Sequence, residues 1–292
     1  MIVTRLAMLA SMELRRFDAV GDFLGIAEPF LVEREAEHNL MLGVASSLTE
    51  APEAYSGPPY LALVSDDGRV VAAAVRTPPF RLIVSEVDDP RAITLLAEDS
   101  LADELPGVLG PVEHVRAFVE ARTALGGPPA ALEMSERVYR LTEVQPMPSI
   151  GGQARPATLD DRDVVLAWLE AFRREAFGEA DPVSVVADAD RWLARRGRSL
   201  HVWEDGDVIS LAGTGGRTPN GIRIGPVYTP PEARRRGYAS ALVAAVSQEA
   251  LDAGCRFCFL FTDQANPTAN HIYQVIGYAP VRDVEAYAFG PS

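Results

Sequence analysis

The chain has 292 residues and a net charge of −14, and its 27 basic residues are all arginines. A hydrophobic fraction of 48% and a charged fraction of 23% are ordinary for a globular protein, so they exclude a wholly disordered chain. The acidic balance argues against bulk nucleic-acid binding, which needs a positive surface. No apolar run reaches the roughly 18–20 residues of a membrane helix, so we expect no membrane partner.

The start of the chain, Met1 to Met12, has one arginine and a short apolar stretch without the pattern of a signal peptide, which predicts a cytoplasmic protein. Met12 is an alternative start, which the mass of the natively expressed protein would test. The length favours two domains. Residues 145–153 contain two prolines and two glycines and no periodicity, so we predict a linker between a domain at 1–147 and a domain at 153–292.

The two halves of the sequence repeat one predicted plan. Each begins with a short polar strand and a helical pattern, followed by two apolar runs joined by an acidic turn with glycine. These turns are Asp67-Gly68 and Asp205-Gly206, and such dipeptides between apolar runs are typical of β-hairpins. Each half then continues as helix, apolar strand, helix and closing strand. We therefore predict a duplicated α/β (α+β) chain, in which each half is a mixed, mostly antiparallel twisted sheet flanked by helices.

The second half has the clearer pattern of alternating strands and helices. The predicted elements lie at residues 223–228, 232–253, 256–261, 266–276 and 278–281. Asn266 followed by Pro267 is a typical helix start, and Gly254 and Gly277 are typical of positions just after a helix end. A strand, helix, strand order predicts parallel pairing with a right-handed crossover.

Cys255 and Cys258 have a C-x-x-C spacing within a short apolar run that predicts a buried strand. Residues three apart on a strand point to opposite faces, and a lone pair is poor evidence for zinc. We interpret both cysteines as structural and expect no metal.

The segment from Val227 to Ser240 predicts a strand that leads through an arginine- and glycine-rich loop into a helix. The first amides of a helix have no intrahelical partner and carry a partial positive charge, so they bind phosphate groups well. The three arginines Arg234, Arg235 and Arg236 add local charge. Because salt screens charges beyond about 8 Å, the net negative charge of the chain does not prevent binding of an anion here.

These residues resemble motif A of the GNAT superfamily of acyl-CoA-dependent N-acyltransferases. The family pattern Arg/Gln-x-x-Gly-x-Gly/Ala is matched by Arg234-Arg-Arg-Gly237-Tyr-Ala239, and the segment from Asn266 to Tyr278 is similar to motif B. The resemblance covers about residues 153–289 and implies tandem GNAT-like domains with a catalytic acetyltransferase domain at 153–292. We interpret domain 1–147 as a degenerate copy, because residues 85–91 contain no glycine and place carboxylates where phosphates would lie. The alternative is an unrelated α/β domain with a coincident hairpin.

The resemblance implies direct transfer of an acetyl group from acetyl-CoA to a primary amine in a ternary complex. The Val227 amide would polarise the thioester carbonyl, and Tyr273 would protonate the departing thiolate. Backbone groups of Val227 and Thr229 would bind pantetheine, and the Gly225-Pro226 dipeptide is compatible with a local break of the strand. The residues expected to contact the cofactor are Val227, Tyr228, Thr229, Arg234, Arg235, Arg236, Gly237, Tyr238, Ala239, Ser240, Asn266, Asn270 and Tyr273.

Several points stay open at the level of sequence. The general base is Glu175, Glu179, Glu204 or water, which some members of the family use. The acceptor is a small-molecule or peptide amine of undetermined identity, the acyl chain length is open, and the chain is a monomer or a homodimer. The alternative function is a non-catalytic acyl-CoA-binding or regulatory module. Binding of ATP through a Walker motif is disfavoured, because the chain has no lysine.

Overall fold

The computed structural model describes residues 12–178, 182–195 and 197–290. The chain forms two compact units, and neither is continuous in sequence. Unit 1 contains the described residues up to Val138, together with Asp263–Ala265 and the chain from Val281 onwards. Unit 2 contains Tyr139–Thr262 and Asn266–Pro280. The hypothesis of a start at Met12 concerns residues 1–11, which lie outside the described residues.

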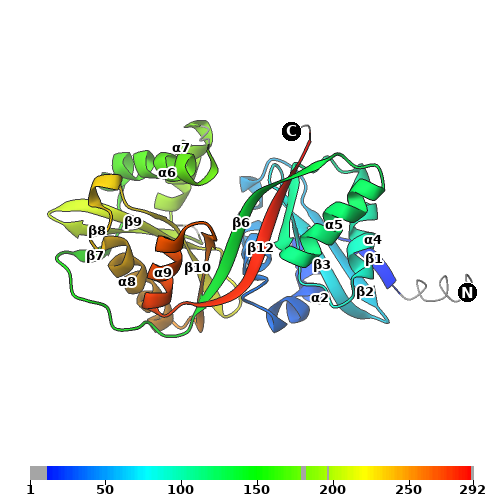
Figure 1. Ribbon diagram of the computed structural model, residues 1–292, viewed down its shortest axis with the longest axis horizontal. Helices are drawn as coiled ribbons and strands as arrows, with labels where there is room; N and C mark the ends of the chain where they lie inside the picture. The colour runs from blue at the N-terminus through cyan, green and yellow to red at the C-terminus, as the bar shows by residue number, and fades with distance from the viewer. Residues whose placement is uncertain (1–11, 179–181, 196, 291–292) are drawn as a thin grey trace, which may run out of the picture. The chain divides into compact units, whose positions relative to one another are not determined.

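The elements of the first half follow the predicted order, except that the predicted helical pattern after the first strand forms two helices and that the short strand at Leu82–Val84 was not predicted (Figure 1). They are β1 (Met12–Arg16), α2 (Val20–Glu33), α3 (Asn39–Glu50), β2 (Tyr60–Asp66), β3 (Arg69–Arg76), β4 (Leu82–Val84), α4 (Arg91–Asp99), β5 (Gly107–Pro111), α5 (Val112–Ala124) and β6 (Ala130–Leu141). Short 3-10 turns lie at η1 (Pro52–Ala54) and η2 (Ser100–Ala102).

The second half repeats this order element by element. It consists of β7 (Gln153–Pro156), α6 (Arg162–Phe177), α7 (Pro182–Leu193), β8 (Ser199–Asp205), β9 (Asp207–Gly215), β10 (Gly221–Tyr228), α8 (Tyr238–Asp252), β11 (Phe257–Asp263), α9 (Pro267–Ile276) and β12 (Ala279–Phe289). Its 3-10 turns are η3 (Leu159–Asp161) and η4 (Pro231–Ala233). Helix α7 has no counterpart among the predicted elements. The repeated order supports the predicted duplication.

In each unit, one of the strand pairs with a defined register is parallel, and the others are antiparallel. In unit 1 the strand order is β1-β2-β3-β4-β5-β12, and β4 runs parallel to β5. In unit 2 the order is β6-β11-β10-β9-β8-β7, and β10 runs parallel to β11. A parallel pair needs a crossover connection, which α4 supplies in the first half and α8 in the second.

The closing strands do not stay with their own half of the sequence. Most of β12, from Val281 onwards, belongs to unit 1, where Val284 to Ala288 pair antiparallel with β5. The last residues of β6, Tyr139–Leu141, belong to unit 2. The division between 1–147 and 153–292 therefore stays a prediction about two halves of the sequence, while the compact units interleave them.

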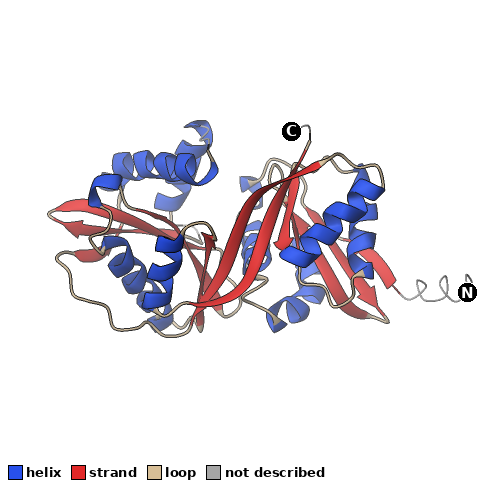
Figure 2. Cartoon of the chain, in the orientation of Figure 1, coloured by secondary structure: helices blue, strands red, loops and turns tan. Residues whose placement is uncertain are grey.

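Helices cover both faces of the sheet in each unit (Figure 2). Along β2, Leu61 and Leu63 pack with α2 and α3, whereas Ala62 and Val64 pack with α4 and α5. This alternation is the period of two that a strand imposes on its side chains. In unit 2, α6 and α7 share a core with Val202, while α8 and α9 share the opposite core.

The predicted helix from residue 232 is wrong at its start. Helix α8 begins only at Tyr238, because Arg235 and Gly237 have φ values of 61° and 89°. A right-handed helix requires negative φ at every residue, so the segment before Tyr238 forms a loop. The helix end is as predicted, with Gly254 at a φ of 98°.

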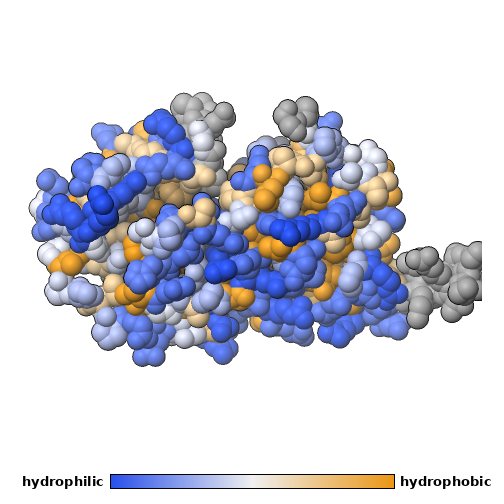
Figure 3. Space-filling model, viewed as in Figure 1, coloured by the Kyte–Doolittle hydropathy of each residue, from blue (hydrophilic) through white to orange (hydrophobic). Residues whose placement is uncertain are grey.

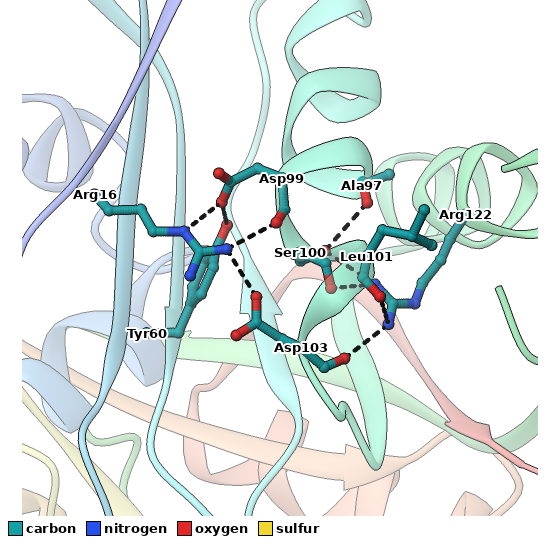
Figure 4. Close-up of polar contacts among 8 residues, drawn as sticks. All are labelled: Arg16, Tyr60, Ala97, Asp99, Ser100, Leu101, Asp103 and Arg122. Carbon is teal, nitrogen blue, oxygen red and sulfur yellow. Dashed lines mark hydrogen bonds and ion pairs between the residues drawn. The ribbon is translucent and has the colours of Figure 1, made fainter.

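A polar cluster in unit 1 ties β1 and β2 to the end of α4 (Figure 4). Arg16 donates from Nε to Asp99 Oδ2 at 2.7 Å and from Nη2 to Asp103 Oδ2 at 2.7 Å. The hydroxyl of the buried Tyr60 donates to the same Asp99 oxygen at 2.6 Å. Burial and this carboxylate raise the pKa of Tyr60. Nearby, the buried guanidinium of Arg122 donates to the Ser100 carbonyl at 2.6 Å.

The visible surface is a mosaic in which apolar side chains are scattered among polar ones (Figure 3). Large apolar side chains that are exposed include Ile26, Phe80, Leu132 and Leu159. Among the helices of the described residues, none has the length and apolar character that a membrane crossing requires.

Candidate functional site

Strand β10 contains a bulge at the dipeptide that predicted a strand break. Its register against β9 shifts between Ile224 and Val227, and Gly225 has a φ of 144°. A Cβ atom on Gly213 of β9 would lie 2.7 Å from the Gly225 carbonyl oxygen and 3.0 Å from Pro226 Cδ. Gly213 therefore gives the bulge the space that it needs.

The same bulge lies where β10 leaves its parallel partner. The register between β10 and β11 runs from Gly221↔Phe257 to Arg223↔Phe259, whereas β10 continues to Tyr228 and β11 to Asp263. On its other edge β10 keeps its pairing with β9, where Val227 pairs with Ala212. The end of β10 thus continues past its registered pairing with β11, as a strand break at Gly225-Pro226 predicts.

The loop after β10 leaves the start of α8 open. Gly237 is the N-cap in a left-handed conformation, and the N-cap makes no side-chain hydrogen bond. The Ala241 amide donates to the Gly237 carbonyl at 3.0 Å, so the amides of the three residues between them precede the first helical hydrogen bond. Arg235 and Arg236 are exposed beside this end. Free amides, the helix dipole and two cations fit a phosphate group.

The corresponding helix start in the first half is occupied by the protein itself. At α4, the Arg91 amide donates to Asp89 Oδ1 at 2.9 Å. Asp88 forms ion pairs with Arg34 at 2.9 Å and with Arg69 at 3.0 Å. A carboxylate already satisfies the helix start where an anionic ligand would bind, which supports the prediction of a degenerate copy.

Arg234 has a different environment from its two neighbours. Its Nε donates to the Thr229 carbonyl at 2.8 Å, and its Nη2 donates to both carboxylate oxygens of Glu175, at 2.8 and 2.7 Å. The guanidinium also lies 5.6 Å from the centre of the Tyr228 ring. Because protein groups already hold this cation, the charge available to a ligand comes from Arg235 and Arg236, and Arg234 instead fixes the loop to β10 and α6.

The start of α9 is built as the sequence predicted. Asn266 is the N-cap, and its side chain accepts a hydrogen bond from the Ala269 amide at 3.0 Å. Asn270 accepts through Oδ1 from the Tyr139 hydroxyl at 2.9 Å and donates from Nδ2 to the Asn266 carbonyl at 2.7 Å. The two asparagines thus have structural partners within unit 2.

Tyr273 lies one turn further along the same helix. Its half-buried ring meets Tyr278 edge to face at a centroid distance of 6.0 Å. Burial raises the pKa of Tyr273 to about 12, so the phenol is protonated at neutral pH. Within the described part of the chain, its hydroxyl has no hydrogen-bond partner. The side chain is therefore free to donate its proton to a ligand.

The described candidates for a general base are both paired with arginine. Glu175 is held by Arg234, and Glu204 accepts from Arg155 at 2.8 Å. Each of these carboxylates would have to leave its guanidinium partner before it could accept a proton from an incoming amine. Glu179, the third candidate, lies outside the described residues.

The two cysteines have the environment of structural residues. Both are free, and Cys258 is fully buried in β11, where its Sγ donates to the Ser247 carbonyl at 3.6 Å. Burial raises the pKa of Cys258 to about 12, which suppresses the reactive thiolate.

Two residues of this region were not predicted from the sequence. Gly213 lies in an apolar run without any turn signal, and only its position opposite the bulge reveals its role. Tyr139 precedes the predicted linker, so the sequence assigned it to the first domain, whereas it lies in unit 2.

The comparisons with known proteins identify both the domain and the fold. Residues 163–278 match the model of the Acetyltransferase (GNAT) family. No curated protein sequence matches this chain.

The chain is similar in structure to solved proteins over almost its whole length. A Drosophila protein is 15% identical with a TM-score of 0.68, covering 95% of this chain and 98% of that one. A GNAT-family acetyltransferase from Colwellia psychrerythraea is 11% identical with a TM-score of 0.55, covering 95% and 100%. A tandem GNAT protein from the clavulanic acid biosynthesis pathway is 14% identical with a TM-score of 0.57, covering 96% and 99%. These similarities confirm the predicted tandem fold.

Proposed function

Residues 163–278 form a domain of the GNAT acetyltransferase family, and on this premise we propose that the chain transfers an acetyl group from acetyl-CoA to a primary amine. The observation that carries the proposal is the open start of α8, which the loop at residues 229–237 connects to the bulged end of β10. An open helix start suits a pyrophosphate, and a strand that has left its partner offers free backbone groups to a pantetheine arm.

In this proposal the amides from Arg235 to Ser240 bind the pyrophosphate, with Arg235 and Arg236 supplying charge. Backbone groups of Val227 and Thr229, on either side of Tyr228, bind the pantetheine arm. The Val227 amide donates to the thioester carbonyl and stabilises the oxyanion that forms there. Asn266 keeps an amide group for the CoA arm, because its cap uses only the side-chain oxygen.

The proposed reaction is a direct transfer between two bound substrates. The neutral amine attacks the thioester carbonyl, a C–N bond forms, and the C–S bond then breaks. Tyr273 gives its proton to the departing sulfur and is reprotonated from solvent, while the ammonium proton of the new amide leaves to water. We favour water over Glu175 and Glu204 because both carboxylates are paired with arginine.

The alternative is a module that binds acyl-CoA without catalysis. Among the residues that the structure describes, none forms a hydrogen bond with the Tyr273 hydroxyl, and this favours the enzyme because binding alone does not require a proton donor at this position.

Tyr273→Phe separates the two functions. We expect turnover of acetyl-CoA with a responsive amine to fall by about 10² to 10³-fold, a typical range for loss of a proton donor. Calorimetry should give CoA affinity within about twofold of the original, since only a hydroxyl is removed, with one site per chain in both proteins. Unchanged turnover would remove Tyr273 from the mechanism. Absence of acetyl transfer in a screen of amines, amino acids, aminoglycosides and peptides, with CoA bound, would favour the module.

A further inference from the structure

Tyr139 is a residue of the first half of the sequence that lies inside unit 2. It occupies the end of β6, before the predicted linker, and it is fully buried in the core that includes Leu242 and Tyr278. A buried tyrosine hydroxyl needs hydrogen-bond partners, because an unpaired polar group in an apolar core is costly.

Its partners lie on α9, on both sides of the proposed proton donor. The Tyr139 hydroxyl donates to Asn270 Oδ1 at 2.9 Å and accepts from Gln274 Nε2 at 3.3 Å. Asn270 and Gln274 are four residues apart and therefore lie on one face of the helix. Tyr273 lies between them in sequence, so the two hydrogen bonds fix the helical turn that carries it.

The chain that follows Tyr139 holds the other end of the same helix. The Gln145 amide donates to the Ile276 carbonyl at 2.8 Å. At Gly277, which ends the helix, a Cβ atom would lie only 2.7 Å from the Glu143 carbonyl oxygen. The segment from Tyr139 to Gln145 thus contacts α9 along its last two turns.

Helix α9 depends on such contacts for its position. It has ten residues, and isolated helices shorter than about 12–15 residues are marginal in water. A displacement of about 1 Å at a catalytic group can cost roughly 100-fold in rate. We propose that Tyr139 is a positioning residue that holds Tyr273 in place, so that the first half of the sequence completes the catalytic unit. This inference rests on the proposed function of Tyr273.

The test is Tyr139→Phe in the full chain, which removes one oxygen and keeps the ring. We expect kcat to fall about tenfold while KM for acetyl-CoA stays within about threefold, because the pyrophosphate contacts on α8 are untouched. The control is Tyr60→Phe, which removes the hydroxyl of another buried tyrosine, one that donates to Asp99 in unit 1. This control should leave kcat unchanged. Equal losses of kcat in both variants would overturn the proposal.

A double variant distinguishes positioning from a general loss of structure. If Tyr139 acts through Tyr273, Tyr139→Phe has no further effect on kcat once Tyr273→Phe is present. If the two losses simply multiply, Tyr139 does not act through Tyr273 and the proposal fails.

Hydrogen exchange gives a reading that does not depend on activity. In the folded Tyr139→Phe protein, amides of residues 270–276 should exchange at least about fivefold faster, while amides of α8 should not change. Exchange of α9 that matches the original protein would show that the hydroxyl does not hold the helix, whatever the reaction. Faster exchange together with no acetyl transfer by the original protein would instead refute the proposed function alone and leave the anchoring of α9 supported.

Discussion

Replacing Gly213 by alanine tests whether the bulge in β10 shapes the site. The new Cβ would lie 2.7 Å from the Gly225 carbonyl oxygen, 3.0 Å from Pro226 Cδ and 3.0 Å from Trp192 Cη2. Ordinary contacts of a Cβ begin near 3.4 Å, so the bulge must move by several tenths of an ångström. Neither the backbone of Gly225 nor the ring of Pro226 is flexible enough to move alone.

The expected cost follows from this overlap. Overpacking of a filled site typically costs about 1–3 kcal/mol, which lowers Tm by roughly 2–12 °C in a domain of this size. Because the bulge carries Val227 and the proposed oxyanion amide, we also expect kcat to fall by about tenfold or more. Thermal unfolding and steady-state release of CoA measure the two effects.

Gly215→Ala is the matched control on the same face of β9. Its Cβ would meet Arg198 Cβ at 3.2 Å and Trp192 Cη2 at 3.4 Å, which are side-chain atoms at nearly ordinary distance. We expect a change in the free energy of unfolding within about 1 kcal/mol and a kcat within about twofold. If Gly213→Ala proves as stable and as active as Gly215→Ala, the close approach does not shape the site.

Two further predictions concern charged groups. His38 accepts from the Glu86 amide at 3.0 Å and donates to the Leu31 carbonyl at 2.9 Å, and burial lowers its pKa to about 4. In the unfolded chain His38 takes up a proton near pH 6.5, whereas in the folded protein it stays neutral down to about pH 4. The free energy of unfolding therefore falls by up to about 3 kcal/mol as the pH is lowered from 6.5 towards 4. Urea unfolding at pH 7 and pH 4.5 should show that the free energy of unfolding decreases less with acid in His38→Gln than in the original protein. Equal decreases in the two proteins would contradict this prediction. Glu175→Gln should leave kcat within about threefold, because Arg234 holds this carboxylate, whereas a drop near 100-fold would identify Glu175 as the base.

Local chemistry explains why some of the site could be predicted from sequence. The cap formed by Asn266 depends on residues within one turn, and the Asp-Gly turns set the hairpins in the same way. The break at Gly225-Pro226 also follows from the residues themselves. Motif spacing then located the loop before α8, although the loop is longer than predicted because Arg235 and Gly237 take positive φ.

Contacts between residues far apart in the chain leave no local pattern and could not be predicted from the sequence. From the sequence, each of the three adjacent arginines is an equally good candidate for binding phosphate. Only the structure shows that Arg234 is paired with Glu175, 59 residues away. The sequence also shows two similar helix starts, and only the structure reveals that the first amide of α4 donates to Asp89, whereas the N-cap of α8 makes no side-chain hydrogen bond.

The sequence by itself determined most of the order of elements, with α7 and β4 as exceptions, and also the family resemblance of the second half and the positions of its two motifs, because these depend on local propensity and spacing. Tertiary structure decided which strands close which unit, which side chains remain free and which residue of the first half holds α9. Those outcomes arise from pairing between segments far apart in the chain. The contact of Tyr139 with Asn270, 131 residues away, is the clearest case: neither residue carries a local signal for the other.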